Sequence, residues 1–445
     1  MKNFRINLPT AVKAVLNSLE ACGHEAFVVG GCVRDCIMGK EPNDWDVTTS
    51  ALPSEVESAL KNYTVIKTGI EHGTVTALIN STPIEVTTYR IDGGYTDSRH
   101  PESVSFTKSL EEDLKRRDFT MNAIAYCEKT GIVDPYGGVG DILSRVIRAV
   151  GVASERFNED ALRILRALRF SSVLDFEIES STSDAIISHR DLLLNISAER
   201  IMSELSKLLC GKNVLNILLN YKSVFFTLIP ELSVCDGFEQ RTKYHIYDIY
   251  THMAHAVSKI KPDLKLRLAM LLHDIGKPKC FEVDENGAGH FPSHAGVSSE
   301  IAHDILKRLK FDRETVNYVT LLVKSHDIPI VADENILLKR LNRFGEKALR
   351  DLILIKRSDN LSKSDIVLPR IKEFDEVDRV LDRIITEKKC FSLKDLQING
   401  NDIKSLGVAE GKKIGLVLSS LLESVIDGKI PNEKSVLLRE VKRLI

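Results

Sequence analysis

The chain has 445 residues, of which 43% are hydrophobic and 28% are charged, and its formal net charge at pH 7 is −2. This length predicts two to four domains, and the composition is typical of a soluble globular protein. No apolar run reaches the roughly 18 residues of a membrane-spanning helix, and we find no secretion signal in residues 1–23, so we expect a cytoplasmic protein with no membrane association. No Cys-x-x-Cys pair occurs, and we therefore expect the cysteines to be reduced.

The first third of the chain mixes strand and helix signals. Short apolar or alternating runs predict strands at residues 26–29, 76–80, 84–90 and 122–126. After Gly140 the pattern changes to a period of 3.6 residues, as in residues 158–174 and 198–209, and strand signals nearly vanish. The sequence therefore predicts an α+β fold, with a mixed β-sheet and helices in an N-terminal head and only helices in the remainder.

A glycine pair follows the first predicted strand. Gly30 and Gly31 come directly after residues 26–29, and we expect a helix to begin near Val33. Glycines at a strand–helix junction let backbone N–H groups approach a phosphate, and the start of a helix favours its negative charge. Arg34, in the first turn of that helix, could donate to the phosphate oxygens. The motif predicts a phosphate-binding turn, although a glycine pair by itself is often only a tight turn.

Two aspartates come shortly after this turn. Asp44 and Asp46 flank Trp45 in a strand-like stretch, and alternation would place both carboxylates on one face. Like charges this close are costly unless a cation holds them, and Mg²⁺ prefers hard oxygen ligands and bridges phosphates. The pair predicts a catalytic Mg²⁺ site for two-metal phosphoryl transfer. Glu85 is the candidate third carboxylate, which would activate the attacking hydroxyl; the alternative is a structural strand residue.

Several segments together resemble one family. GGCVRD followed by DWD looks like the polymerase-β-type nucleotidyltransferases. LKRRDFTMNAIAY, NEDALRILRALRF, DGGYTDSRHPESV and NGNDIKSLGVAEGKKIG narrow the resemblance to the class II tRNA CCA-adding enzymes and bacterial poly(A) polymerases. The resemblance covers nearly the whole chain. It implies transfer of CMP, CMP and AMP from CTP and ATP to the 3′ end of tRNA, with Mg²⁺ and release of pyrophosphate.

The same resemblance implies roles for individual residues. Those implied to bind nucleotide are Gly31, Arg34, Arg117, Asp160, Arg163, Arg166 and Arg169. The partners implied are tRNA, CTP and ATP, and we infer no obligatory protein partner. The loop at residues 92–101, which resembles the flexible loop of the CCA-adding branch, and the tail favour CCA addition over a poly(A) polymerase. A CC-only or A-only enzyme remains an alternative.

Asp160 and Arg163 match the nucleobase template of that family. We expect Asn158 to cap a helix with Asp160 in its first turn, which would place Asp160 and Arg163 on one face. A carboxylate accepts from the exocyclic amine of cytosine or adenine, and a guanidinium donates to the neighbouring ring nitrogen. Uracil and guanine would present a carbonyl to the carboxylate. The alternative is a surface salt bridge. Arg169 would lie opposite Asp160 on that helix, where it would reach phosphate or brace the helix.

A second group of candidate ligands lies between Tyr244 and Asn360. Imidazole and carboxylate groups together suit divalent transition metals or Mg²⁺. The run His-Asp-x-Gly-Lys resembles the HD phosphohydrolase superfamily, whose minimal ligand set matches His252, His273, Asp274 and Asp359. His294 and His326 could complete a larger site. The resemblance implies a divalent metal of unknown identity, and leaves open whether the site hydrolyses a phosphate ester or only binds.

These motifs define four expected domains. They are a nucleotidyltransferase head (residues 1–145), a helical neck that binds nucleobase and RNA (146–212), a helical body with the HD metal site (213–365) and a helical tail that binds tRNA (366–445). Six arginines and three acids lie between Arg145 and Arg169, which gives the neck the local positive charge that RNA binding requires. A rival interpretation is an HD phosphohydrolase whose head only recognises RNA, against which the intact Asp44 and Asp46 argue.

Overall fold

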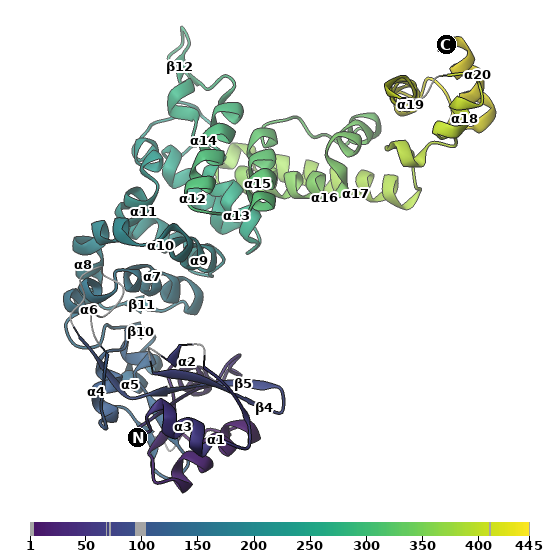
Figure 1. The fold of residues 1–445 in the computed structure, drawn as a ribbon. Coiled ribbons are helices and arrows are strands. Elements are labelled where there is room, and N and C mark those ends of the chain that lie inside the picture. The colour runs from purple at the N-terminus through teal and green to yellow at the C-terminus, as the bar shows by residue number, and fades with distance from the viewer. Residues whose placement is uncertain (1–3, 68, 71–72, 94–103, 409–410, 445) are drawn as a thin grey trace. The chain divides into compact units, whose positions relative to one another are not determined.

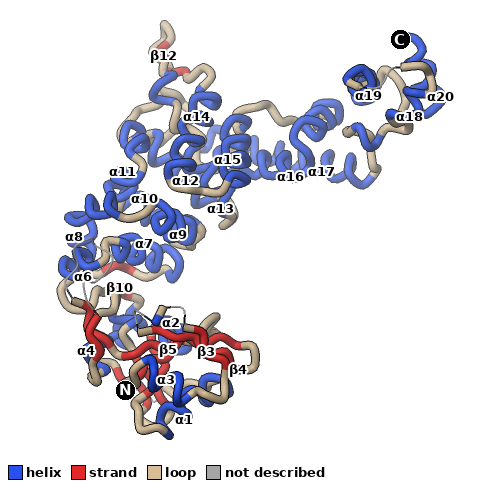
Figure 2. The backbone as a smooth tube through the Cα atoms, viewed as in Figure 1, coloured by secondary structure: helices blue, strands red, loops and turns tan. Residues whose placement is uncertain are grey.

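The computed structural model describes residues 4–67, 69–70, 73–93, 104–408 and 411–444, and the chain divides into two compact units, Met1–Pro230 and Glu231–Ile445 (Figure 1). Nearly all strands belong to the first unit, and helices make up most of the second (Figure 2). None of the described helices is both long and apolar enough to cross a membrane. The predicted α+β class is confirmed, whereas the division into four domains stays a prediction.

A seven-stranded mixed sheet forms the core of the first unit, in the order β3-β4-β5-β2-β1-β8-β9. Its strands are β1 (Ala26–Val29), β2 (Asp46–Thr49), β3 (Thr64–Ile66), β4 (Thr74–Ile79), β5 (Thr82–Thr88), β8 (Ala125–Cys127) and β9 (Gly131–Val133). β2 and β5 pair in parallel, and the other neighbouring strands pair antiparallel. β1 is buried along its whole length, as its unbroken apolar run predicts.

Short helices and a two-stranded ribbon complete the head. They are α1 (Thr10–Ala21), α2 (Gly31–Ile37), α3 (Pro53–Ala59), α4 (Leu110–Lys115), α5 (Gly138–Ser144), β6 (Arg90–Asp92) and β7 (Val104–Phe106). α2 begins at Gly31, earlier than expected, because Gly30 turns the chain with a left-handed φ of 81°. The strand predicted at residues 122–126 is shorter than expected, since residues 120–122 form a 3-10 turn and β8 begins at Ala125.

The rest of the first unit is helical apart from one short parallel strand pair, β10 (Val146–Ile147) with β11 (Glu177–Ile178). Its helices are α6 (Ala153–Glu159), α7 (Leu162–Leu174), α8 (Ser180–His189), α9 (Ala198–Leu209), α10 (Val214–Asn220) and α11 (Lys222–Leu228). α7 packs against α9. The prediction of one helix over residues 158–174 is wrong, because α6 ends at Glu159 and α7 begins at Leu162.

Among its described residues, the second unit consists of helices and one hairpin, β12 (Glu282–Val283) and β13 (Gly289–His290). The helices are α12 (Ile249–Lys259), α13 (Leu264–Leu272), α14 (His294–Arg308), α15 (Arg313–Ser325), α16 (Glu334–Asn360), α17 (Pro369–Thr386), α18 (Gly400–Lys404), α19 (Lys412–Ile426) and α20 (Lys434–Leu444). Aspartate side chains cap the starts of α12, α13, α15 and α16 by accepting backbone N–H groups. α16 is kinked at Gly345, where φ is 75°.

Candidate active site and metal cluster

The glycine turn after β1 brings together three of the predicted residues. A Cβ atom at Gly30 would lie 3.0 Å from a guanidinium nitrogen of Arg117, and one at Gly31 would lie 3.7 Å from that of Arg34. Gly30 also needs its left-handed conformation to start α2. The turn therefore requires glycine for its φ and for the close approach of Arg117 to the backbone.

Three carboxylates gather at the edge of β2 nearest this turn. Asp46 is the first residue of β2 and is paired in register with Glu85 of β5. Residues paired in this way project to the same face of a sheet. Asp44 lies in the bend before β2, so the expectation that both aspartates belong to one strand is wrong. The structure nevertheless brings the third candidate, Glu85, beside Asp46.

The charge of these acids is incompletely balanced. Burial, followed by the carboxylates of Asp44 and Glu85, raises the pKa of Asp46 to about 6, against the opposing charge of Arg117. The oxygen atoms of the three acids do not all lie within 4.8 Å of one another in the described structure. The three carboxylates therefore lie near the turn, but their oxygen atoms do not form one compact set of ligands.

Asp113, which the sequence analysis missed, connects two parts of this group. Its side chain is completely buried and accepts from the Thr48 hydroxyl at 3.1 Å, from Arg116 at 2.9 Å and from Arg117 at 3.4 Å. Burial would raise the pKa of Asp113, but the guanidinium groups of Arg116 and Arg117 hold it below its ordinary value. Asp113 therefore ties Arg117 to the strand that carries Asp46.

A second hydrogen-bond network joins the head to α7. Arg34 donates to the Asn122 side chain at 2.9 Å, and Asn122 donates to Asp118 at 3.0 Å. Arg166 of α7 donates twice to the other oxygen of Asp118, at 2.8 and 2.6 Å. Burial alone would raise the pKa of Asp118, but Arg166 and Asn122 lower it to about 2. Two predicted nucleotide-binding arginines, Arg34 and Arg166, are therefore fixed by one buried acid.

Phe170, also missed, packs against three of the predicted arginines. The guanidinium carbons of Arg34, Arg166 and Arg169 lie 5.2, 5.5 and 3.9 Å from its ring centre. The ring meets Phe119 edge-on at 5.8 Å. Arg169 also forms an ion pair with Glu204 of α9 at 2.6 Å, which braces α7 against α9. A nucleotide contact by Arg169 stays a prediction.

Asp160 lies between two helices. Its backbone is extended, with φ of −140°, and its carboxylate accepts from the backbone N–H of Leu162 at 3.1 Å and from Arg200 of α9 at 2.8 Å. The expectation that Asn158 caps this helix is wrong, because Asn158 lies inside α6. The side chain of Asp160 itself satisfies an N–H at the start of α7.

Arg163 has different partners from Asp160. It donates to Glu159 at 2.6 Å and to the carbonyl of Arg116 at 2.8 Å, and it is 9% exposed. Because Asp160 precedes α7 and Arg163 lies within it, the two do not share one helix face as expected. Both remain on the same short segment, so their joint role in base choice stays a prediction.

A histidine–aspartate cluster lies in the second unit. It consists of His252, His273, Asp274, His294, His326 and Asp359, which combines the predicted minimal ligand set with both additional histidines. Asp274 lies 3.5 Å from His252 and 3.2 Å from His273 through one oxygen, and 3.4 Å from His294 and 3.6 Å from His326 through the other. The structure thus brings together residues that are up to about a hundred positions apart in the chain.

Backbone carbonyls orient all four imidazoles. The Nδ1 atoms of His252, His273, His294 and His326 lie 2.7–3.1 Å from the carbonyl oxygens of Ser362, Met270, Phe291 and Val323, respectively. When Nδ1 of a neutral imidazole donates to the carbonyl, Nε2 is left with a lone pair, and each of the four Nε2 atoms lies within 3.6 Å of a carboxylate oxygen of Asp274. This is the arrangement of metal-binding histidines, whose second nitrogen is held by a carbonyl or carboxylate.

Two nitrogens of the cluster lack hydrogen bonds. The Nε2 atoms of His252 and His273 are buried without a hydrogen-bond partner, although carboxylate oxygens lie within 3.7 Å. Burial disfavours the charged form of His273, but Asp274 and Asp359 outweigh it and raise its pKa to about 9, so a metal ion would bind this Nε2 in place of a proton. Buried nitrogens aimed at carboxylates without satisfied geometry fit a bound cation.

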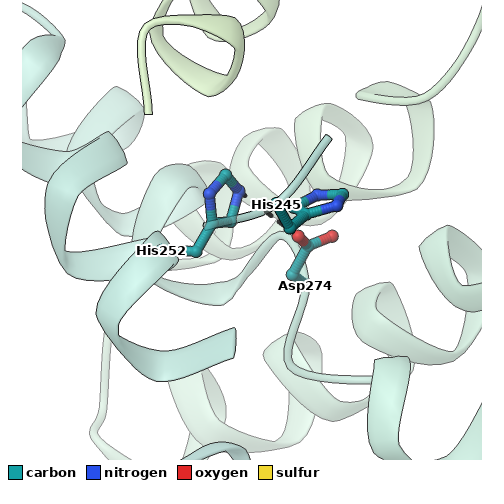
Figure 3. A group of neighbouring side chains, drawn as sticks. All are labelled: His245, His252 and Asp274. Atoms are coloured by element: carbon teal, nitrogen blue, oxygen red, sulfur yellow. Dashed lines mark ion pairs between the residues drawn. The ribbon is translucent and has the colours of Figure 1, made fainter. Parts of the chain in front are cut away.

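Two lysines and a further histidine border the cluster and were missed by the sequence analysis. Lys277 lies 2.6 Å from Asp274, and Lys363 lies 2.6 Å from Asp359. His245, from the loop before α12, lies beside His252 and Asp274 (Figure 3). Burial and the neighbouring Lys277 lower the pKa of His245 to about 2. The run His-Asp-x-Gly-Lys was the signal that could have identified Lys277.

The predicted flexible loop can be only partly located. β6 ends at Asp92 and β7 begins at Val104, and residues 94–103 between them lie outside the described residues. The expected role of this loop in CCA addition therefore stays a prediction.

Comparison with known proteins places both units in one family. The poly(A) polymerase head domain matches residues 26–148, a family described as "Probable RNA and SrmB-binding site of polymerase A" matches residues 175–234, and tRNA nucleotidyltransferase domain 2 matches residues 290–441. CCA-adding enzymes of Lactiplantibacillus plantarum and Levilactobacillus brevis are each 34% identical to this chain. These similarities cover 96% of this chain and 94% and 96% of the two enzymes.

A solved structure shows the same relationship. The CCA-adding enzyme of Bacillus stearothermophilus in complex with CTP is 28% identical, with a TM-score of 0.71 over 99% of this chain and 98% of that one. The sequence motifs, the fold and the full-length relatives agree. The chain belongs to the CCA-adding enzymes, within the class II group of tRNA nucleotidyltransferases and poly(A) polymerases.

Proposed function

We propose that this chain adds C, C and A to the 3′ end of tRNA, transferring CMP and AMP from CTP and ATP with release of pyrophosphate. One observation carries the proposal: Asp46 and Glu85 lie side by side in the sheet next to a glycine turn lined by Arg34 and Arg117. Carboxylates beside a phosphate-binding turn are what transfer of a nucleotidyl group requires. Relatives that match over nearly the whole chain are CCA-adding enzymes, which favours this activity over poly(A) addition.

The three carboxylates of the head fit Mg²⁺. Burial and the negative charges of Asp44 and Glu85 raise the pKa of Asp46 despite the opposing charge of Arg117, and all the donors are hard oxygens. Asp44 and Asp46 would hold the ion, which would neutralise phosphate charge and lower the pKa of the attacking hydroxyl. Glu85 would accept the proton of that hydroxyl. Gly31, Arg34 and Arg117 would bind the triphosphate. Arg166 would support them, because it donates to Asp118, which Asn122 links to Arg34.

Asp160 and Arg163 would select the base. Asp160 already accepts hydrogen bonds from Leu162 and Arg200, so its carboxylate is oriented before any base arrives. Its remaining lone pairs could accept the exocyclic amine of cytosine or adenine. Arg163 would donate to the adjacent ring nitrogen, and for this it must exchange its contact with Glu159.

The experiment is to incubate the protein with tRNA that lacks its 3′ CCA, together with CTP, ATP and Mg²⁺, and to sequence the new ends. We expect ends completed to CCA. Ends with long runs of A would show a poly(A) polymerase, and ends that stop at CC would show a partial enzyme. Glu41→Gln serves as a control for the loss of an acidic side chain. Glu41 is an exposed acid in the same segment as Asp44, and its substitution should leave the products unchanged.

A second activity is supported by the cluster in the second unit. His252, His273, Asp274 and Asp359 would bind a divalent metal, which would activate water for hydrolysis of a phosphate ester. The supporting observation is the pair of buried, unbonded nitrogens of His252 and His273. The test is metal content and phosphatase or phosphodiesterase activity in Asp274→Asn, with His303→Ala as the control, since His303 lies on α14 outside the cluster. Metal content equal to that of the wild type in Asp274→Asn would contradict this site.

A further inference from the structure

We propose that Phe170 is a positioning residue for nucleotide binding, whose ring orients Arg34 and Arg166 toward the triphosphate of CTP or ATP. The inference rests on the proposed nucleotidyl transfer and adds a residue on which that reaction depends. The side chain of Phe170 is 6% exposed and lies on α7, one position after Arg169 and one helical turn after Arg166. Arg34 reaches the same ring from α2, so two helices of the first unit meet at this side chain.

Three guanidinium groups converge on the ring of Phe170. Their central carbon atoms lie 3.9 Å (Arg169), 5.2 Å (Arg34) and 5.5 Å (Arg166) from its centre. All three distances are within the limit of about 6 Å at which an aromatic face attracts a cation. Phe119, which is completely buried, meets the ring at an angle of 84° between the two planes and thereby restricts its orientation. The ring is therefore a fixed contact that three cations share.

The three guanidinium groups repel one another. Burial lowers the pKa of Arg169, and the charge of Glu204 opposes this effect. The charges of Arg166 and Arg34 lower the pKa of Arg169 further. Like charges this close need a compensating attraction when no anion is bound. Nearby acids supply part of that attraction, and the face of Phe170 supplies a contact that is common to all three arginines.

An aromatic ring orients a guanidinium group differently from a carboxylate. An ion pair such as that of Arg166 with Asp118 uses N–H donors and offsets the positive charge. The attraction to an aromatic face uses none of the five N–H donors and leaves the charge in place. Phe170 can therefore orient Arg34 and Arg166 while it competes for none of the N–H groups that would bind phosphate oxygens.

The alternative role for Phe170 is to fill the space between α2 and α7. A leucine would fill much of that space but has no aromatic face. The two roles differ in what the loss of the ring changes. Packing alone affects the stability of the fold, whereas the orientation of the arginines affects a ligand according to the number of phosphates that it carries.

The test measures Kd values of the full-length chain for labelled CTP, ATP and CMP by equilibrium dialysis with Mg²⁺ and without tRNA. Phe170→Leu should raise the Kd for CTP by about 3- to 30-fold, the range expected for loss of a desolvated contact between a cation and a ring. ATP should show the same factor, because the triphosphate is common to both, and CMP should show a smaller one. Phe170→Tyr, which keeps the aromatic face, should bind CTP within about twofold of the wild type.

Phe176→Leu is the matched control. Phe176 is also buried, and the guanidinium carbon near its ring, at 5.9 Å, belongs to Arg145, which has no assigned part in nucleotide binding. This variant should bind CTP as the wild type does. Unfolding temperatures identify a variant that has lost its fold, and Phe170→Met, which also lacks a ring, replaces Phe170→Leu if the leucine variant does not fold.

The outcomes separate this inference from the proposed transfer reaction, because the assay needs no transfer to tRNA. A folded Phe170→Leu or Phe170→Met variant that binds CTP as the wild type does would overturn the role of Phe170 alone. Equal loss of affinity for CTP and CMP would overturn it too, since the effect would then not depend on the phosphates. A wild type that binds no CTP would overturn both proposals.

Discussion

Glu85 of β5 lies in register with Asp46 of β2, although the two residues are far apart in the sequence. This pairing makes Glu85 the group best placed to take a proton from a hydroxyl that attacks near Asp46. General base catalysis typically contributes about 10²–10⁴-fold. We predict that Glu85→Gln slows CMP addition to tRNA by about that factor while CTP binding changes little.

The measurement for Glu85 is single-turnover incorporation of CMP with saturating CTP. Thr87→Ala is the control, because Thr87 lies on the same strand two positions further on. A Glu85→Gln rate within threefold of the wild-type rate would show that Glu85 is only a strand residue.

The template role predicts a specific loss of base choice. Asp160→Ala removes the acceptor for the exocyclic amine, and a good bidentate base contact provides roughly 1–3 kcal/mol of discrimination. The variant should slow with CTP and ATP and lose much of its bias against UTP and GTP. Arg163→Ala should slow the reaction without admitting UTP. Arg169→Ala, whose side chain pairs with Glu204, should leave the base ratio unchanged.

Base choice is measured as kcat/KM for all four nucleotides on tRNA that ends before its CCA. If Asp160→Ala keeps full selectivity for C and A, the base is read elsewhere. Asp160 would then serve only to start α7 and to bind Arg200.

The ion pair between Asp118 and Arg166 predicts a pH-dependent stability. The pKa of Asp118 is about 2 in the folded chain, below its ordinary value of about 3.9. The pair therefore contributes fully above about pH 4, and its contribution is lost as the pH falls through about 2. Asp118→Asn should lower the free energy of unfolding by about 1–3 kcal/mol at pH 7, because Arg166 loses its charged partner.

Urea unfolding of the wild type and Asp118→Asn at several pH values checks this. The difference between them should be constant from pH 7 to pH 5 and should shrink below pH 4. A difference that does not change with acidity would mean that the carboxylate charge contributes nothing.

The two sites should act independently because they share no residue. His273→Ala combined with Asp274→Ala should abolish metal-dependent hydrolysis of phosphate esters, while CCA addition should change by less than about twofold. Both rates are measured on the same preparation with Mg²⁺ supplied to the head. Parallel loss of both activities would show either a single shared site or general unfolding.

Local motifs in the sequence were sufficient to find part of the candidate site. Short sequence runs were enough to predict the glycine turn, the position of Asp46 beside it and the strand that carries Glu85, and the structure contains all three. The break before α7 was not predictable in this way, because Arg200 of α9 holds Asp160 from a distance in the chain. Asp113 and Phe170 were missed since their burial depends on packing rather than on any local pattern.

For the histidine cluster, the sequence identified the residues but not their arrangement. Residue types and the His-Asp-x-Gly-Lys run identified residues that the structure brings together from more than a hundred positions of the chain, and their role as metal ligands stays a prediction. Spacing alone could not show that Asp274 lies between two histidine pairs, because that depends on how α12 to α16 pack around it.

The most direct test of nucleotidyl transfer by the head compares the wild type with Asp46→Asn. Single-turnover incorporation of labelled CMP into tRNA lacking CCA is measured beside the Kd for the same tRNA. The variant should lose at least about 10³-fold in rate, because several kcal/mol of metal-dependent stabilisation are removed, and its Kd should stay within about twofold. A rate close to that of the wild type, with tRNA still bound, would contradict the assignment of the transfer site to Asp46 and its neighbours.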